Sequence, residues 1–220
     1  MALILCLETA TTNCSVALCE EGSVIALKED NSKGYSHAEK LHVFIDEILK
    51  ENNLKINDVD AVAISKGPGS YTGLRIGVSA AKGLCFAQDI PLISVPTLTA
   101  LAKQAFPNEG EQVIPMLDAR RMEVYSAVFN SDFNQIRETK AQVLSEDSFQ
   151  EELEKGKVYF IGNGVSKFKE ICAHSNAIYV EDKLPSAREM CAIAHNKYKI
   201  GDMEDVAYFE PYYLKDFVTG

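Results

Sequence analysis

Two acidic residues stand where an apolar run ends, and carboxylates in that position are candidates for phosphoryl-transfer chemistry. Glu8 follows the run from Leu3 to Leu7, and Asp118 follows the run from Val113 to Leu117. A continuous apolar run without polar alternation is typical of a strand that is buried on both faces. A carboxylate at the end of such a strand can position a metal-bound phosphate. Alternatively, each acid only caps the turn that follows its strand.

The residues next to these acids are not those of a working phosphate site. Glycines normally let a phosphate approach the backbone, but the chain continues as Glu8-Thr9-Ala10 and as Asp118-Ala119-Arg120. Glycines do follow the apolar run that ends at Ile161. We therefore predict a nucleotide cleft that is at most vestigial, and its residues would be Glu8, Thr9, Asp118, Gly162 and Gly164.

A glycine-rich turn lies between a predicted strand that ends at Ser65 and a predicted helix that begins near Thr72. It fails the P-loop pattern, which needs a lysine directly after its last glycine, because Gly73 is followed by Leu74. It also fails the dinucleotide pattern, whose third glycine is replaced by Thr72. Ser70 lacks the flanking glycines of a nucleophile elbow. The turn therefore matches none of these catalytic or phosphate-binding motifs.

The helix after this turn contains glycines at a regular spacing. Gly73, Gly77 and Ala81 are four residues apart and form a ridge without large side chains. Each glycine inside a helix costs roughly 1 kcal/mol relative to alanine. Such a ridge lets another backbone come close. The ridge either packs on the chain's own sheet or is shaped for a partner's helix.

Histidine and cysteine spacing gives no metal site. His37 and His42 are five residues apart, which places them roughly 140° apart around a helix. The six cysteines include no C-x-x-C pair. We therefore predict no bound metal and no disulfide framework, as is usual in a reducing compartment.

The order of the predicted elements indicates an α/β fold with two domains. Three short strands come first, and helix–strand crossover units follow, which implies a mixed sheet with helices on its faces. Capping boxes begin two helices, at Ser36 and at Ser186. A polar segment after Ala105 suggests domains at 1–105 and 106–220, and the second half repeats the pattern more weakly. The helix after Ser186 could pack with either domain.

Composition limits the functional classes. The chain has 220 residues, of which 46% are hydrophobic, and its net charge is −10. No basic cluster is evident, so we expect no strong direct binding of nucleic acid. No apolar run approaches the roughly 20 residues of a membrane span, and the first residues lack a basic flank. We therefore expect a cytoplasmic protein that does not contact membranes.

Three stretches resemble one protein family over nearly the whole chain: Leu3–Thr9, Gly67–Arg75 and Asp118–Arg120. The chain is similar to the TsaB family, also called YeaZ, subunits of the bacterial machinery that makes threonylcarbamoyladenosine on transfer RNA. Shorter similarities lie at Ile161–Gly164 and Pro211–Leu214. The resemblance implies an actin-like ATPase (ASKHA) fold with two ribonuclease-H-like lobes.

The resemblance also implies a role. Members are non-catalytic relatives of TsaD, the threonylcarbamoyltransferase, and pair with it through helices of the first lobe; the ATPase TsaE belongs to the same complex. Homodimers through the same helices, and ATP or ADP bound only in the partner complex, are further expectations. On this chain the interface residues would be His37, Lys40, Leu41, Gly73, Leu74, Gly77, Val78 and Ala81.

The resemblance implies one function, and the two acidic residues leave a second one open. The first is a scaffold subunit that pairs with and activates TsaD; on this interpretation Gly77→Leu weakens pairing and leaves folding mostly intact. The second is an independent actin-fold phosphotransferase that uses Glu8 and Asp118 around magnesium and ATP.

Overall fold

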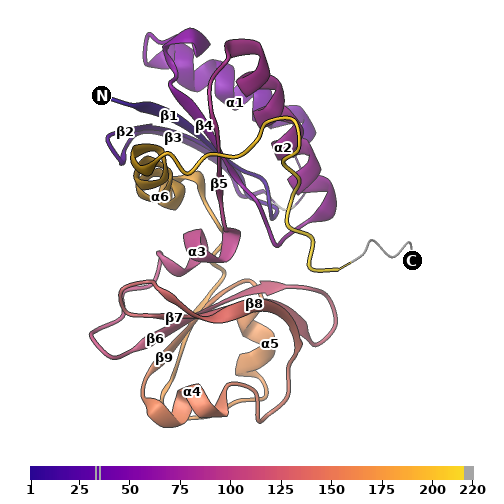
Figure 1. Cartoon of the computed structure of the whole chain (residues 1–220). Helices are drawn as coiled ribbons and strands as arrows, with labels where there is room; N and C mark the ends of the chain where they lie inside the picture. The colour runs from indigo at the N-terminus through magenta and orange to yellow at the C-terminus, as the bar shows by residue number, and fades with distance from the viewer. Residues whose placement is uncertain (33, 35, 216–220) are drawn as a thin grey trace. The chain divides into compact units, whose positions relative to one another are not determined.

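The computed structural model describes residues 1–32, 34 and 36–215, and it divides into two compact units. The first unit contains residues 1–97 and returns at 185–213. Of the described residues, the second contains 98–184, Leu214 and Lys215. Each unit is built on one five-stranded sheet (Figure 1).

The first sheet has the strand order β3-β2-β1-β4-β5. The two pairs formed by β1, β2 and β3 are antiparallel, whereas β4 pairs parallel with both β1 and β5. The sheet is therefore mixed, as the sequence predicted. Its strands are β1 (Leu3–Glu8), β2 (Cys14–Glu20), β3 (Ser23–Asp30), β4 (Ala61–Ser65) and β5 (Leu92–Val95).

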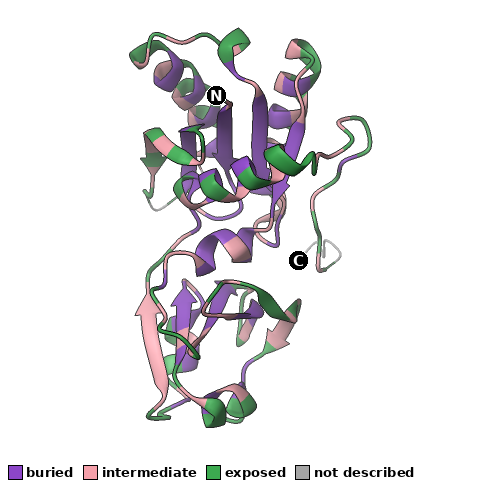
Figure 2. Ribbon diagram, turned by 60° about the vertical axis from the view of Figure 1, so that its left-hand side comes forward, coloured by how far each residue is buried: buried purple, intermediate pink, exposed green. Residues whose placement is uncertain are grey.

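Helices cover both faces of this sheet. Leu3, Leu5 and Leu7 of β1 pack in one cluster with residues of α1 (His37–Glu51) and α2 (Tyr71–Gln88). Cys6 points to the other face, where its thiol contacts Cys191 of α6 (Ala187–Ile200). Side chains on both faces of the sheet are therefore buried, and β1, β4 and β5 are buried along their whole length (Figure 2).

The second sheet has the order β10-β9-β6-β7-β8, so it repeats the connectivity of the first. Its helix α3 (Thr97–Ala102) packs on one face, and α4 (Gln150–Lys155) and α5 (Val165–Lys169) pack on the other. A ribonuclease-H-like sheet order in each unit gives the α/β, ASKHA-like fold. The strands are β6 (Gln112–Asp118), β7 (Glu123–Asn130), β8 (Gln135–Val143), β9 (Val158–Gly162) and β10 (Ala177–Glu181).

The structure divides the chain at a different residue from the predicted one, and it places a helix whose packing the sequence had left open. The units separate after residue 97 rather than after residue 105, because Leu98, Leu101 and Ala102 pack in the core of the second unit. The helix after Ser186 returns to the first unit and contacts all five of its strands. The first domain is therefore discontinuous in sequence, a placement that the sequence had left open.

Of the two predicted capping boxes, only the one at Ser186 has a serine side chain that caps its helix. The Ser186 hydroxyl accepts a hydrogen bond from the Arg188 N–H, as a cap requires. The Ser36 hydroxyl makes no such bond and instead donates to Asp30, at 2.6 Å. Short elements complete the fold, including the 3-10 turn η1 (Ile56–Asp58). In the part of the chain that the structure describes, no helix is long and apolar enough to cross a membrane.

Candidate functional site

Glu8, a residue of the predicted vestigial nucleotide cleft, is enclosed at the end of β1. Its side chain is fully buried, and its Oε1 accepts hydrogen bonds from the Ala10 N–H at 2.6 Å and from the Ser65 hydroxyl at 2.7 Å. Burial raises the pKa of Glu8 from 4.5 to about 7. The carboxyl group therefore binds the turn that follows its own strand, and it does not face solvent in this unit.

The glycine ridge of α2 packs on the residue after Glu8. A Cβ added at Gly73 would overlap the Thr9 carbonyl oxygen, and one added at Gly77 would overlap the Thr9 hydroxyl oxygen. It would also come within 2.9 Å of Ile64 on β4. The close approach that the glycines permit is therefore made by the chain's own sheet.

His37 packs against the turn that follows β1. Its Nε2 lies 2.7 Å from the Thr11 carbonyl oxygen, in the turn between β1 and β2. The side chain is buried, and that burial lowers the pKa of His37 below its ordinary value of 6.5. The residue therefore belongs to the core and positions a turn. His42, five residues on, is exposed, so the two histidines do not share a site.

The predicted interface residues are thus mostly internal. Apart from Lys40, all of them are buried in the first unit, and Lys40 forms an ion pair with Asp30 at 2.6 Å. These residues offer little exposed surface in the first unit, and their place in an interface stays a prediction. The buried residues are His37, Leu41, Gly73, Leu74, Gly77, Val78 and Ala81.

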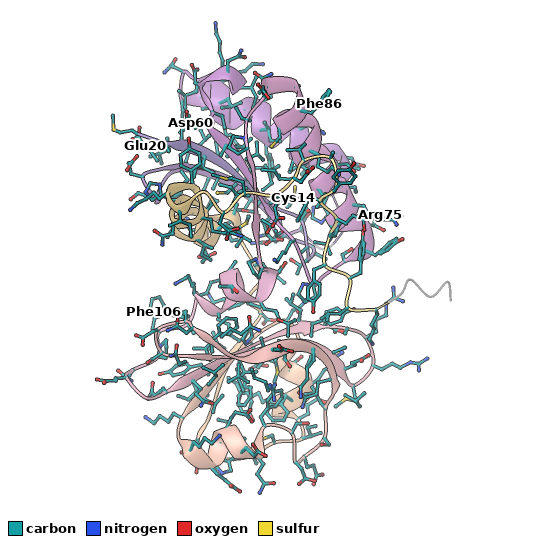
Figure 3. The ribbon with its side chains drawn as sticks, in the orientation of Figure 1. Cys14, Glu20, Asp60, Arg75, Phe86 and Phe106 are labelled. Carbon is teal, nitrogen blue, oxygen red and sulfur yellow. The ribbon has the colours of Figure 1, made fainter. Side chains whose placement is uncertain are left out.

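The opposite sides of α1 and α2 carry a surface groove of about 550 Å³. Phe86 of α2, which is labelled in Figure 3, is 86% exposed. Val43 of α1 is 49% exposed. The sequence analysis did not predict this surface. The signal for it would have been the large apolar residues that lie outside the buried stripe of each helix. The groove is lined by His42, Arg75, Ile76, Ser79, Ala80, Gly83 and Leu84.

The glycine-rich turn before α2 uses its backbone inside the unit. The N–H groups of Gly67, Ser70 and Gly73 donate to Thr97 Oγ1, Ala10 O and Ser70 Oγ. These donors are therefore not directed at an external phosphate, in agreement with the failed motif matches.

The same turn receives the C-terminal segment. The Tyr212 N–H donates to the Lys66 carbonyl at 2.7 Å, and a Cβ at Gly67 would lie 2.7 Å from the Tyr212 carbonyl oxygen. Arg75 fixes the next residue: its Nε donates to the Tyr213 hydroxyl at 3.2 Å. The specific glycine motif thus holds the segment that packs along α2.

In the second unit, Asp118 is solvent-accessible and already paired. Its Oδ1 accepts hydrogen bonds from the Arg120 N–H at 2.6 Å and from Lys167 Nζ at 2.7 Å. The Asp118 N–H donates to Asn163 Oδ1 at 2.9 Å. Gly162 has φ +128°, and a Cβ there would overlap the Met116 carbonyl.

Gly164 approaches the same strand from the following turn. Its N–H donates to the Met116 carbonyl at 3.0 Å, and a Cβ there would lie 2.8 Å from Val124. Both glycines of the predicted vestigial cleft therefore serve close packing on β6. Among the residues that the structure describes, no group of three or more acidic, histidine or cysteine side chains could hold a metal ion.

Comparison with known proteins identifies the family. The family model for TsaD, the tRNA N6-adenosine threonylcarbamoyltransferase, matches residues 32–219. The tRNA threonylcarbamoyladenosine biosynthesis protein TsaB of Haemophilus influenzae is 33% identical, over 98% of this chain and 94% of its own length. TsaB of Escherichia coli is also 33% identical, over 98% of this chain and 96% of its own.

Comparison with solved structures points to the same family. The solved structure of YeaZ from Pseudomonas aeruginosa superimposes with a TM-score of 0.79 at 27% identity, over 97% of this chain and all of that chain. The chain therefore belongs to the TsaB (YeaZ) family, and it shares with TsaD the domain that the family model describes.

Proposed function

We propose that this chain acts in the biosynthesis of threonylcarbamoyladenosine on transfer RNA, as a non-catalytic scaffold that pairs with and activates a TsaD-type threonylcarbamoyltransferase. The names of its relatives support the pathway. The observation that carries the scaffold role is the apolar groove between the outer sides of α1 and α2. The enclosed Glu8 carboxyl group supports it, because this acid has no open position for a substrate in its own unit.

The proposed occupant of the groove is the TsaD-type subunit. The TsaD family model extends over α1 and α2, so the partner has a counterpart of the same helix pair. Two related helix pairs can pack by their outer sides around a pseudo-two-fold axis, as in symmetric dimers. Ile76 and Leu84 are half-buried in the groove and would be covered by such a partner.

The resemblance to the family implies further components. A TsaE-type ATPase would join the pair, and ATP or ADP would bind only in that complex. A second copy of this chain would use the same groove and would compete with the TsaD-type subunit. ATP turnover by the isolated chain, lost in Glu8→Ala, would favour the phosphotransferase interpretation instead.

The test uses size-exclusion chromatography with light scattering on the chain alone and mixed with its cognate TsaD. We expect a one-to-one species that supports threonylcarbamoyl transfer when TsaE and ATP are added. Gly83→Glu probes the groove, because a Cβ at Gly83 meets nothing within 4 Å and the substitution removes a glycine from a helix. The variant should fold normally and fail to form the complex.

The control is Ala192→Glu, an equal change of charge at an exposed position of α6, on the other face of the sheet. It should pair like the wild-type chain. No complex from the wild-type chain with folded TsaD would contradict the scaffold role. Equal pairing by both variants would remove the groove from the interface.

A further inference from the structure

The turn between β6 and β7 holds two consecutive arginines in an unfavourable backbone conformation. Arg120 has φ +70° and Arg121 has φ +49°, the left-handed region that glycine and asparagine tolerate best. The turn is closed by hydrogen bonds from Ala119 N–H to the Glu123 carbonyl and from Glu123 N–H to the Arg120 carbonyl. A chain that keeps arginine at both positions gives up stability, which is a reason to look for a function of the side chains.

The charges around this turn leave the arginines uncompensated. Asp118 pairs with Lys167 at 2.7 Å, and Glu123 contacts Lys215. Both arginines are exposed, and neither guanidinium has a partner among the described residues. Four cationic side chains thus gather around two carboxylates, on a chain whose net charge is −10.

We propose that Arg120 and Arg121 contact backbone phosphates of the transfer RNA when the chain is in its complex with the TsaD-type subunit. The proposal rests on the proposed function, since that complex supplies the RNA. A guanidinium group presents a planar set of donors that matches the oxygens of a phosphate. The acidic chain as a whole would still bind RNA weakly alone, so the turn adds a local contact to an affinity that the complex provides.

An RNA phosphate explains the exposure of the arginines better than a protein partner does. Arginines that dominate protein interfaces lie in desolvated pockets with apolar surroundings. Phosphate contacts are commonly made by solvated arginine and lysine side chains, and they position the nucleic acid without reading its sequence. Here the neighbours of the turn are the paired side chains of Asp118, Glu123, Lys167 and Lys215.

The experiment compares wild-type complex with complex that carries Arg120→Asn and Arg121→Asn. Asparagine tolerates the left-handed conformation, so the variant should unfold at a temperature equal to or above that of the wild type. The probe is an unmodified transfer RNA transcript, and its dissociation constant is measured between 50 and 200 mM salt by fluorescence anisotropy. Loss of two phosphate contacts should weaken binding about ten- to thirty-fold at 0.1 M salt and reduce the slope of log K against log salt by about 1.5.

Two further variants make the outcome specific. Lys155→Asn with Lys183→Asn removes the same charge from exposed positions elsewhere in the second unit and should change the salt slope less. Arg120→Lys with Arg121→Lys keeps the charge and should retain most of the affinity.

The outcomes separate this proposal from the proposed function. An unchanged dissociation constant and salt slope in the asparagine variant would overturn the phosphate contact. If that variant instead fails to assemble with the TsaD-type subunit in light scattering, the arginines bind protein and the proposal is wrong. Failure of the wild-type chain to assemble would contradict the proposed function itself.

Discussion

The hydroxyl oxygen of Thr9 occupies the space that a side chain at Gly77 would need. This relationship joins the turn after β1 to the middle of α2, and Gly73 makes the equivalent contact with the Thr9 carbonyl oxygen. The small ridge of α2 is therefore used inside the first unit. A change at Gly77 tests the packing of this unit before it tests a partner, which corrects the expectation that Gly77→Leu leaves folding mostly intact.

We predict that Gly77→Ala destabilises the protein by about 1–3 kcal/mol, the usual cost of overpacking a core. This loss should appear although alanine favours helix by roughly 1 kcal/mol over glycine. Urea unfolding followed by circular dichroism measures the effect. Gly77→Leu should then fail to give a folded first unit, because the larger side chain meets both Thr9 and Ile64.

Two variants test the cause of this loss. Gly83→Ala lies in the same helix with free space around its Cβ, and it should stabilise by about 0.5–1 kcal/mol. Thr9→Ala removes the hydroxyl group that Gly77 faces, so it should recover part of the loss when combined with Gly77→Ala. Additive effects of these two substitutions would contradict a direct contact.

The sequence predicted the strands that are buried on both faces and also the edge strand β3, but it missed the edge strands β8 and β10. The apolar runs of β1, β4, β6 and β9 are continuous, since helices cover both sides of each strand. The polar sequence of β8 gave no such signal, because β8 is an edge strand whose residues are half-buried or exposed. The strand β10 is the other edge, and none of its residues is fully buried.

The candidate site was predicted less well for a physical reason. Glycine spacing indicates that something approaches α2 closely, but it does not indicate whether that is the chain's own strand or a partner. His37 and Leu41 fitted an interface on helix position alone, and the structure places both in the core. The outer groove depends on how α1 and α2 pack together, and this is a tertiary relationship that no short pattern records.

The raised pKa of Glu8 predicts a pH dependence of stability. Its pKa is about 7 in the folded chain against an ordinary value of 4.5, so the folded state binds the proton more tightly. The resulting stabilisation is complete below about pH 4.5 and is lost as the pH rises to about 7. The difference corresponds to about 3 kcal/mol, since one pKa unit is 1.36 kcal/mol.

Glu8→Gln isolates this contribution from other titrating groups. The glutamine oxygen can accept the hydrogen bonds from Ala10 and Ser65 at every pH. We therefore expect the variant to gain stability relative to the wild type as the pH rises from 5 to 8, measured by urea unfolding at each pH. Parallel stability curves for the two proteins would show that Glu8 keeps an ordinary pKa.

We predict that a substitution of the exposed Phe86 weakens assembly with the TsaD-type subunit and does not affect folding. Its side chain is 86% exposed on α2, so Phe86→Ser should leave the unfolding midpoint unchanged. Burial of a phenylalanine in the complex is worth about 1.5–3 kcal/mol, which corresponds to roughly a 10- to 100-fold loss of affinity for the TsaD-type subunit. Titration calorimetry measures that affinity.

Phe106 supplies the matched control for this prediction. It is also 86% exposed, but it belongs to the second unit (Figure 3). Phe106→Ser should bind the TsaD-type subunit like the wild type. Equal losses in both variants would indicate a general effect of surface hydrophobicity rather than a specific contact.

The last prediction concerns Gly67 and the C-terminal segment. Gly67 has φ +108°, and a Cβ there would lie 2.7 Å from the carbonyl oxygen of Tyr212. Gly67→Ala should therefore add a steric clash to the cost of a left-handed alanine, which is about 1–2 kcal/mol. The clash should displace the segment around Tyr212, and limited chymotrypsin digestion should then cleave there earlier than in the wild type.

Gly110→Ala separates the cost of the backbone conformation from the cost of the steric clash. Gly110 has φ +82°, and a Cβ there meets nothing within 4 Å, so alanine adds backbone strain and no contact. We expect Gly110→Ala to lower stability by the conformational cost alone and to leave the C-terminal segment resistant to protease. If both alanine variants lose the same stability and the segment stays protected in each, the glycine is required by its backbone angle rather than by Tyr212. Because the glycine turn also leads into α2, a released segment in Gly67→Ala alone would establish that this motif positions the C-terminal segment on the helix.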